Sequence, residues 1–135
     1  MIDAEPGRRR RAPRPGPSRD EALCPRSKVW LERGGQVVLS DWRVELLEAI
    51  EATGSLARAA ERLEVPYRTA WYKLKEIERR LGVRLLETQS GGADGGGSQL
   101  TAEAREVVAR FHRLNAGIDD LISERFRAEF GGLLD

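Results

Sequence analysis

The sequence predicts a mainly α-helical fold with small β-hairpins, and three patterns support this prediction. Apolar residues recur at helical spacing in most of the stretch from residue 41 to residue 127. Short alternating stretches next to glycines precede the first and the last of the helical segments. No apolar run approaches the ~20 residues of a membrane span, and no charged-then-apolar signal peptide opens the chain. A cytoplasmic protein is therefore expected.

The composition argues against most kinds of enzyme. The 135 residues include 23 Lys and Arg and 22 Asp and Glu, which gives a formal net charge of +1. The single cysteine, Cys24, is expected to be a free thiol, and the single histidine, His112, is expected to be a surface residue without a function. One Cys and one His leave too little material for a zinc site or a histidine-based nucleophile relay. We therefore expect no enzyme activity, no cofactor and no metal.

Positive charge is concentrated in two segments of this nearly neutral chain. Residues 1–28 carry eight basic and four acidic side chains, and residues 66–84 carry six basic and two acidic ones. Local clusters of Lys and Arg, more than net charge, determine contacts with phosphate. A nucleic-acid partner is therefore expected.

The chain should begin with a disordered basic tail over residues 1–27. This segment contains the run Arg8–Arg11 and several prolines, and it shows no apolar periodicity. The arginine run is compatible with phosphate binding and equally with a solvated tail, so both readings stay open. Order should begin near residue 28, with a hairpin of strands 28–33 and 36–39 around Gly34 and Gly35.

Three helices should follow this hairpin. The first is expected over 41–52, with Ser40 or Asp41 as its cap, the second over 56–63, and the third over 66–81, with Pro66 at its first turn. The third helix should bury the stripe Tyr67, Ala70, Trp71, Leu74, Ile77 and Leu81. Its opposite face should expose Arg68, Thr69, Tyr72, Lys73, Glu76, Arg79 and Arg80. Trp30 and Trp42 are also expected to be packing residues.

A second hairpin and a long helix complete the predicted fold. Val83, Leu85 and Leu86 should form one strand and Leu100 should lie in the other, with a glycine-rich loop at 91–97 between them. A helix over 102–127 would be a rod of about 40 Å, which is too long for this small domain to cover alone. Its apolar seam should mediate dimerisation through Val107, Phe111, Leu114, Ile118 and Leu121.

This order of elements is that of a winged helix-turn-helix, which we expect over residues 28–130. Two helices joined by a tight turn are followed by a hairpin, and the second helix is basic on its outer face. In such a domain Arg68 and Thr69 would reach base edges in the major groove, while Tyr72 and Lys73 would hold phosphates. The glycine loop lacks the Gly-Lys-Ser or Gly-Lys-Thr ending of a P-loop, which disfavours nucleotide binding.

Three segments resemble the N-terminal DNA-binding domain of the ModE family of molybdate-responsive regulators. They are Thr53–Ala60 (TGSLARAA), Tyr67–Trp71 (YRTAW) and Gly91–Thr101 (GGADGGGSQLT). The resemblance implies a winged helix like that of LysR-type regulators, a glycine-rich wing and a dimerising helix. Pro66 departs from the serine cap that the family favours. The candidate DNA-binding residues are Ser55, Arg58, Pro66, Tyr67, Arg68, Thr69, Tyr72, Lys73, Gly91, Gly92, Gly95, Gly96, Gly97 and Ser98.

The resemblance and the charge pattern together predict a sequence-specific, double-stranded DNA-binding transcriptional regulator that acts as a dimer. Full-length members of the family carry molybdate-binding modules after this domain, whereas this sequence ends at Asp135. A regulator without its own molybdate-sensing domain is therefore expected. The alternative is a winged-helix adaptor or antagonist that forms heterodimers with a full-length regulator.

Overall fold

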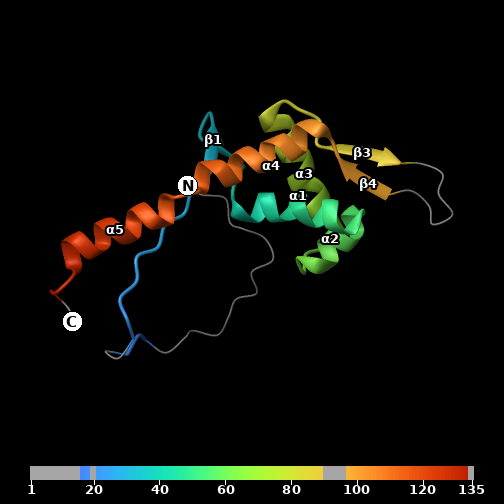
Figure 1. Cartoon of the computed structure of the whole chain (residues 1–135). Helices are drawn as coiled ribbons and strands as arrows, with labels where there is room; N and C mark the ends of the chain where they lie inside the picture. Colours follow the sequence, from blue (N-terminus) through green and yellow to red (C-terminus); the bar gives the residue numbers. More distant parts are fainter. Residues whose placement is uncertain (1–15, 19–20, 90–96, 134–135) are drawn as a thin grey trace.

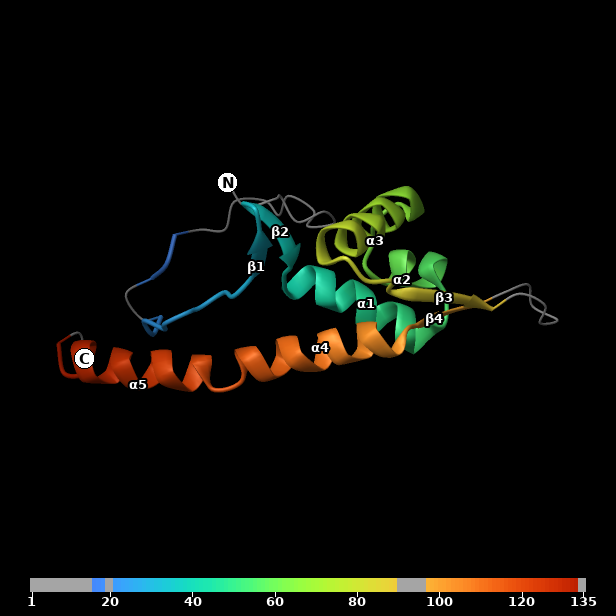
Figure 2. The same ribbon diagram turned by 90° about the horizontal axis from the view of Figure 1, so that it is seen from above.

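The computed structural model describes residues 16–18, 21–89 and 97–133 and confirms the predicted winged helix-turn-helix with two small hairpins. Two antiparallel hairpins flank a group of three short helices, and two further helices form a rod along one side (Figures 1 and 2). In chain order the elements are β1 (Leu31–Arg33), β2 (Gln36–Leu39), α1 (Asp41–Thr53), α2 (Leu56–Arg62), α3 (Tyr67–Leu81), β3 (Leu86–Gln89), β4 (Gly97–Leu100), α4 (Ala102–Asn115) and α5 (Ile118–Phe130).

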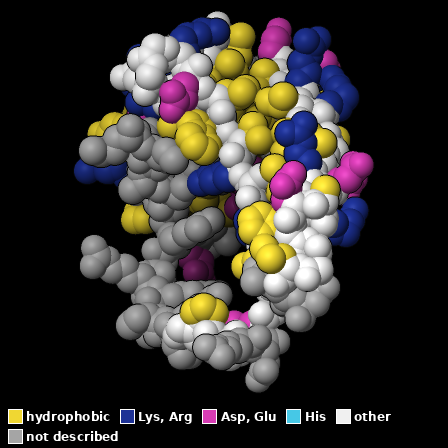
Figure 3. All heavy atoms as spheres, turned by 90° about the vertical axis from the view of Figure 1, so that its left-hand side faces the viewer, with side chains coloured by type: hydrophobic (Ala, Val, Ile, Leu, Met, Phe, Trp, Pro, Cys, Tyr) yellow, Lys and Arg dark blue, Asp and Glu magenta, His cyan; other side chains and the backbone are white. Residues whose placement is uncertain are grey.

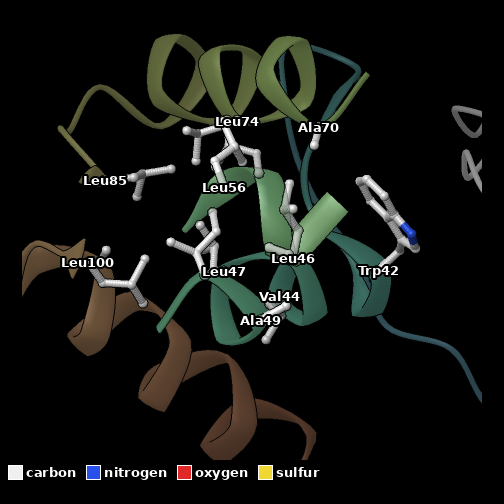
Figure 4. Packing of buried hydrophobic residues seen from close by; sticks show 14 of the residues in the cluster. Trp42, Val44, Leu46, Leu47, Ala49, Leu56, Ala70, Leu74, Leu85 and Leu100 are labelled. Carbon is white, nitrogen blue, oxygen red and sulfur yellow. The ribbon is translucent and has the colours of Figure 1, made fainter. Parts of the chain in front are cut away.

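Helix α1 lies at the centre of the hydrophobic core. Its Leu46, Leu47 and Ile50 are fully buried, and Figure 4 shows its leucines in the space below α3. Ala59 and Ala60 of α2 are also buried, and side chains this small let α2 approach α1 closely. The remaining sides of α1 are covered by apolar residues of α3, β4 and α4, namely Ala70, Leu74, Ile77, Leu100, Ala104 and Phe111.

Side-chain caps and glycines set the helix boundaries close to those predicted. The hydroxyl groups of Ser40, Ser55 and Thr101 each accept a hydrogen bond from the backbone N–H three residues ahead, at the starts of α1, α2 and α4. Helices α1 and α3 end at Gly54 and Gly82, whose φ angles of 71° and 80° are left-handed. Both helices end within one residue of the predicted bounds.

Each hairpin is fastened to the helices by specific hydrogen bonds. The guanidinium of Arg33 in β1 donates to the carbonyl oxygen of Arg80, at 2.9 Å, near the end of α3. In the second hairpin, the N–H of Ser98 donates to the carbonyl oxygen of Gly54 at 2.8 Å. The predicted strand around residue 85 begins at Leu86, since Leu85 precedes it and its N–H is bonded to the Glu78 carboxylate at 2.9 Å.

The predicted single helix over 102–127 is wrong in one respect, because the chain interrupts it. Helix α4 ends at Asn115, and α5 starts after Gly117, whose φ of 83° is incompatible with a continuous right-handed helix. The two helices still follow one another along a common line, with α5 extending away from the rest of the protein (Figure 2). No residue of α5 is buried.

The predicted N-terminal tail lies mostly outside the described residues. Its described parts, residues 16–18 and 21–27, contain no helix or strand, and Cys24 is exposed there. The hydroxyl of Ser27 donates to the carboxylate of Asp119 on α5, at 2.9 Å. In the described part of the chain, no helix combines the length and the apolar character needed to cross a membrane.

The core predicts a clear contrast between two leucine substitutions. Leu46→Ala should lower the free energy of unfolding by about 2–5 kcal/mol, because it leaves a cavity beside fully buried neighbours. Leu23→Ala, at an exposed leucine outside every helix and strand, should change it by less than about 0.5 kcal/mol. Urea denaturation followed by circular dichroism measures both, and similar costs would contradict the described core.

Candidate nucleic-acid interface

A tight turn sets helix α3 against α2. The backbone N–H of Val65 bonds to the carbonyl oxygen of Ala60, and Glu64 takes a left-handed φ of 56°. Pro66 then leads into α3 with its φ fixed near the helical value, at −58°, and no side chain caps the helix. This turn leaves the first residues of α3, Tyr67 and Arg68, exposed to solvent.

The outer face of α3 combines cations with aromatic rings. Tyr67, Arg68, Trp71, Tyr72, Lys75 and Arg79 are all exposed. Among the residues that the structure describes, Arg68 and Arg79 form no ion pair, while Lys75 lies 3.1 Å from the carboxylate of Glu78. Trp71, Tyr72, Lys73, Lys75, Glu76 and Arg79 line an open groove of about 510 Å³. We call the six exposed residues, Tyr67, Arg68, Trp71, Tyr72, Lys75 and Arg79, the α3 face.

The prediction that Trp71 and Tyr67 belong to the buried stripe is wrong. Trp71 is 40% exposed and Tyr67 is more so, whereas Ala70, Leu74 and Ile77 are buried. Residues three and four positions apart share one side of a helix, and the buried positions 70, 74 and 77 satisfy this spacing without either aromatic residue. The stripe is therefore narrower than predicted, and both rings lie outside it.

The prediction that Lys73, Glu76 and Arg80 face solvent is also wrong. Glu76 is only 19% exposed and accepts a 2.8 Å hydrogen bond from Arg43, a residue of α1 that is 2% exposed. Arg80 pairs with the same carboxylate and donates to the carbonyl oxygen of Val37 at 2.7 Å. The ammonium of Lys73 lies 3.6 Å from Glu76. Lys73 is thus turned toward an acidic partner, which weakens its candidacy for phosphate binding.

Glu76 is ionised at neutral pH despite its partial burial. Burial of the carboxyl opposes its ionisation, but the hydrogen bond from Arg43 and the charges of Arg43, Lys73 and Arg80 together outweigh burial. They hold the pKa of Glu76 below its usual value. The sequence carried a weak signal for this cluster, since Arg43 is a charged residue between the apolar Trp42 and Val44 at the start of α1. Its partner is 33 residues away, and such a pairing follows only from the packing of α1 against α3.

The other candidate DNA-binding residues lie at the ends of α2 and of the wing hairpin β3–β4. The Ser55 hydroxyl is engaged in capping α2, and Arg58 is exposed on the first turn of that helix. Gly97 begins β4, where a Cβ atom would meet the carbonyl oxygen of Gly54 at 3.0 Å. Ser98, the next residue, is partly buried. Gly91, Gly92, Gly95 and Gly96 lie outside the described residues.

The candidate dimerisation residues divide into two groups. Phe111 is 3% exposed and belongs to the hydrophobic core of its own chain, so its prediction as a seam residue is wrong. Val107 is partly buried and packs against that core, and its place in the seam stays a prediction. Leu114 and Leu121 are both 46% exposed, and Ile118 is partly buried. Figure 3 looks toward the end where α5 lies and shows apolar side chains at that surface. The exposed apolar positions therefore begin near the end of α4.

His112 has a structural contact that the sequence did not indicate. Its Nε2 atom lies 2.6 Å from the carboxylate of Glu48, so that it connects α4 to α1. Arg105 makes a second connection between these helices through Glu51, at 2.7 Å. The hydrogen bond from Arg105 lowers the pKa of Glu51, against the effect of burial. In the described residues no group of three or more metal-ligating side chains comes together.

The fold and the α3 face define the class of protein, a winged helix-turn-helix with an exposed basic second helix. Residues 43–105 match the family model of the bacterial regulatory helix-turn-helix proteins, lysR family. The matched segment includes most of α1 and all of α2, α3 and the wing hairpin.

The curated relatives extend the match beyond this segment. The molybdenum transport protein ModE of Azotobacter vinelandii is 38% identical over 109 residues, which are 78% of this chain and 40% of that protein. The molybdenum-pterin-binding protein MopB of Rhodobacter capsulatus is 34% identical over 104 residues, which are 77% of this chain and 38% of that protein. The resemblance to ModE regulators is confirmed. The chain spans about two fifths of the length of these relatives.

Solved structures with a similar arrangement include a CbnR DBD–DNA complex. It has a TM-score of 0.48 and 27% identity and covers 64% of this chain and 92% of that chain. A BenM DBD/benA site 1 DNA complex has a TM-score of 0.49 and 21% identity and covers 66% of this chain and 94% of that chain.

The Glu76 cluster predicts a specific dependence of stability on pH. Glu76→Gln should cost roughly 3 kcal/mol at pH 7, because it removes the carboxylate charge that the buried Arg43 guanidinium meets at 2.8 Å. Since the pKa of Glu76 is lowered in the folded protein, its stabilisation is complete above the ordinary glutamate pKa of about 4.3. It is lost as the pH falls through the folded value. The difference between wild type and Glu76→Gln should therefore shrink in acid.

Thermal unfolding of both proteins between pH 7 and pH 3 measures this difference. Glu106→Gln is the matched control, because Glu106 also has a lowered pKa but forms its pairs with Arg110 and Arg113 at the surface of α4. It should change stability little. A Glu76→Gln deficit that stays constant across this pH range would contradict the ionised cluster.

Proposed function

We propose that this chain binds double-stranded DNA in a sequence-specific way and acts as a transcriptional regulator. The observation that carries the proposal is the α3 face, where cations and aromatic rings lie together on the second helix of a helix-turn-helix. An exposed helix with this charge fits the major groove of B-DNA, which is about 12 Å wide. The lysR-family match of residues 43–105 supports the same role.

Two cations of the α3 face receive different roles because of their positions along the helix. Arg68 stands in the first turn, which is the part of a recognition helix that reaches base edges, and its guanidinium can donate two hydrogen bonds to a guanine. Arg79 stands in the last turn, farther from the bases, and serves as a phosphate contact. Arg79 takes this role in place of Lys73, whose ammonium lies near Glu76.

In this proposal, the base of the wing and the first turn of α2 lie together and add a contact with the DNA backbone through Arg58. Ser98 is bonded to the carbonyl oxygen of Gly54, so the base of the wing is fixed to the turn between α1 and α2. Arg58 is exposed near this turn, within the first turn of α2. Contacts of this kind position a protein on the duplex without reading its sequence.

Substitutions of Arg68 and Arg79 distinguish base reading from phosphate binding. Selection of bound duplexes from a random pool first supplies a preferred sequence. Arg68→Ala should then cost ~1–3 kcal/mol on the selected duplex and less on random DNA. Arg79→Ala should weaken both duplexes alike and reduce the slope of log affinity against log salt by roughly one. Fluorescence anisotropy over a series of salt concentrations measures all four combinations.

An equal loss on both duplexes after Arg68→Ala would reassign this residue to phosphate binding. The adaptor role would be favoured by two results together: the wild type binds DNA weakly and without sequence preference, and it forms a stable heterodimer with a longer relative.

We further propose that the chain dimerises through the end of α4 and α5. A helix of 13 residues without buried side chains is marginal in water, since most helices depend on packing for their stability. Helix α5 nevertheless presents large apolar residues, among them Leu121 and Phe130, which are nearly half exposed. Phe126 and Phe130 stack with their ring centroids 5.4 Å apart. A second copy of α5 would cover these residues and supply the missing packing.

A charged residue in this apolar surface should prevent dimerisation. Leu114→Asp would place an unpaired carboxylate against the partner helix, at a cost of several kcal/mol that a small interface does not offset. Since Leu114 is 46% exposed, the monomer should remain folded. Sedimentation equilibrium should show a dimer for the wild type and a monomer for Leu114→Asp. Arg127→Asp, at an exposed charged position of α5, should remain a dimer, and a dimeric Leu114→Asp protein would overturn the assignment.

A further inference from the structure

We infer that Trp71 reads thymine methyl groups in the major groove, an inference that rests on the DNA-binding role proposed above. Trp71 is a large apolar side chain with 40% of its surface exposed, although burial in the adjacent core would have been favourable. Exposed aromatic groups that cluster on one surface are typical of binding sites. Tyr67 and Tyr72, on the same helix, are more exposed than Trp71.

The indole ring of Trp71 is held in place by its neighbours on α3. Tyr72 packs edge-on against it, with a centroid distance of 5.3 Å and an interplanar angle of 78°. The ammonium of Lys75 lies 5.8 Å from the ring centroid, within the range of a cation–π contact. A ring that is already oriented loses little conformational entropy when it binds.

The surroundings of Trp71 favour DNA as the partner over an apolar protein surface. Arg68, Lys75 and Arg79 lie on the same α3 face, and only Lys75 of these three forms an ion pair among the described residues. A partner that covers the indole must also accept these positive charges. The phosphate backbone on both sides of a major groove does so, and it places the apolar ring over the base edges between the strands.

The chemistry of the major groove selects the thymine methyl group as the target. Bases in a duplex are stacked, so their faces are closed to an aromatic side chain and only their edges are accessible. On these edges the C5-methyl of thymine is the apolar group, whereas guanine, adenine and cytosine present hydrogen-bond donors and acceptors. The indole has a single donor and no acceptor. Apolar contact with a methyl group is therefore the specific interaction open to most of its surface.

Replacing single thymines by deoxyuridine tests this inference directly. The replacement removes the methyl group and leaves the hydrogen-bonding edges unchanged. With the duplex selected from a random pool as probe, the wild type should bind about fourfold more weakly when the contacted thymine is replaced, the factor expected for one buried methyl group. Trp71→Ala should bind the thymine and uracil duplexes equally. The four affinities form a double-mutant cycle between the ring and the methyl group.

Matched variants separate a specific contact from a loss of structure. Trp30→Ala removes the same side chain from a position outside α3 and should keep the full difference between thymine and uracil duplexes. Trp71→Phe retains an apolar ring and should keep part of it. If Trp71 only supported the fold, Trp71→Ala would lower both affinities and leave the difference intact, which would overturn the inference.

Two other outcomes also have a definite meaning. If no uracil replacement weakens the wild type, or if Trp71→Ala keeps wild-type affinity for both duplexes, the indole is not a reader of thymine and the inference fails while the proposed DNA binding stands. If the wild type shows no preference for any duplex over random DNA, the proposed function itself fails. The two failures are thus distinguishable.

Discussion

The carboxylate of Glu76 fixes the orientation of α3, and the α3 face depends on that orientation. It joins Arg43 of α1 to Arg80 on its own helix, and Arg80 in turn bonds to the backbone of β2. A helix that packs only through small and aliphatic residues can rotate by some degrees at little cost. An anionic side chain that must meet a buried guanidinium cannot, because an unpaired buried charge is costly. Together with the buried Ala70, Leu74 and Ile77, the cluster therefore determines which residues of α3 face solvent.

The elements of the fold could be predicted from the sequence because their signals are local. Ser40, Ser55 and Thr101 cap helices, and Gly54 and Gly82 end them; each acts within a few residues of its own position. The class of fold followed from the order of these elements. Helix α3 was also identified correctly as the basic helix, and the exposure of Arg68 and Arg79 was predicted because these positions follow from helical periodicity.

The details of the site could not be predicted because they depend on tertiary packing. A stripe of apolar residues indicates which side of α3 faces the core, but it does not indicate how wide the contact with the core is. Trp71, next to the buried residues, was therefore predicted to be buried although it is exposed. The pairing of Arg43 with Glu76 and that of His112 with Glu48 both join residues far apart in the sequence. Charged residues at such positions look like surface residues until the facing helix is known.

The break at Gly117 separates α4, which packs against α1, from α5, which has no buried residue. Helix α4 is held to α1 by Phe111 and by the contacts of Arg105 and His112, so its direction is fixed relative to α3. Helix α5 has no buried residue; the chain turns at Gly117 before it begins, and its Asp119 accepts a hydrogen bond from Ser27. In a dimer, the two recognition helices must meet half-sites about one DNA turn apart, ~34 Å. If α5 dimerises as proposed, a glycine between it and the fixed α4 lets that spacing be set without disturbing the core.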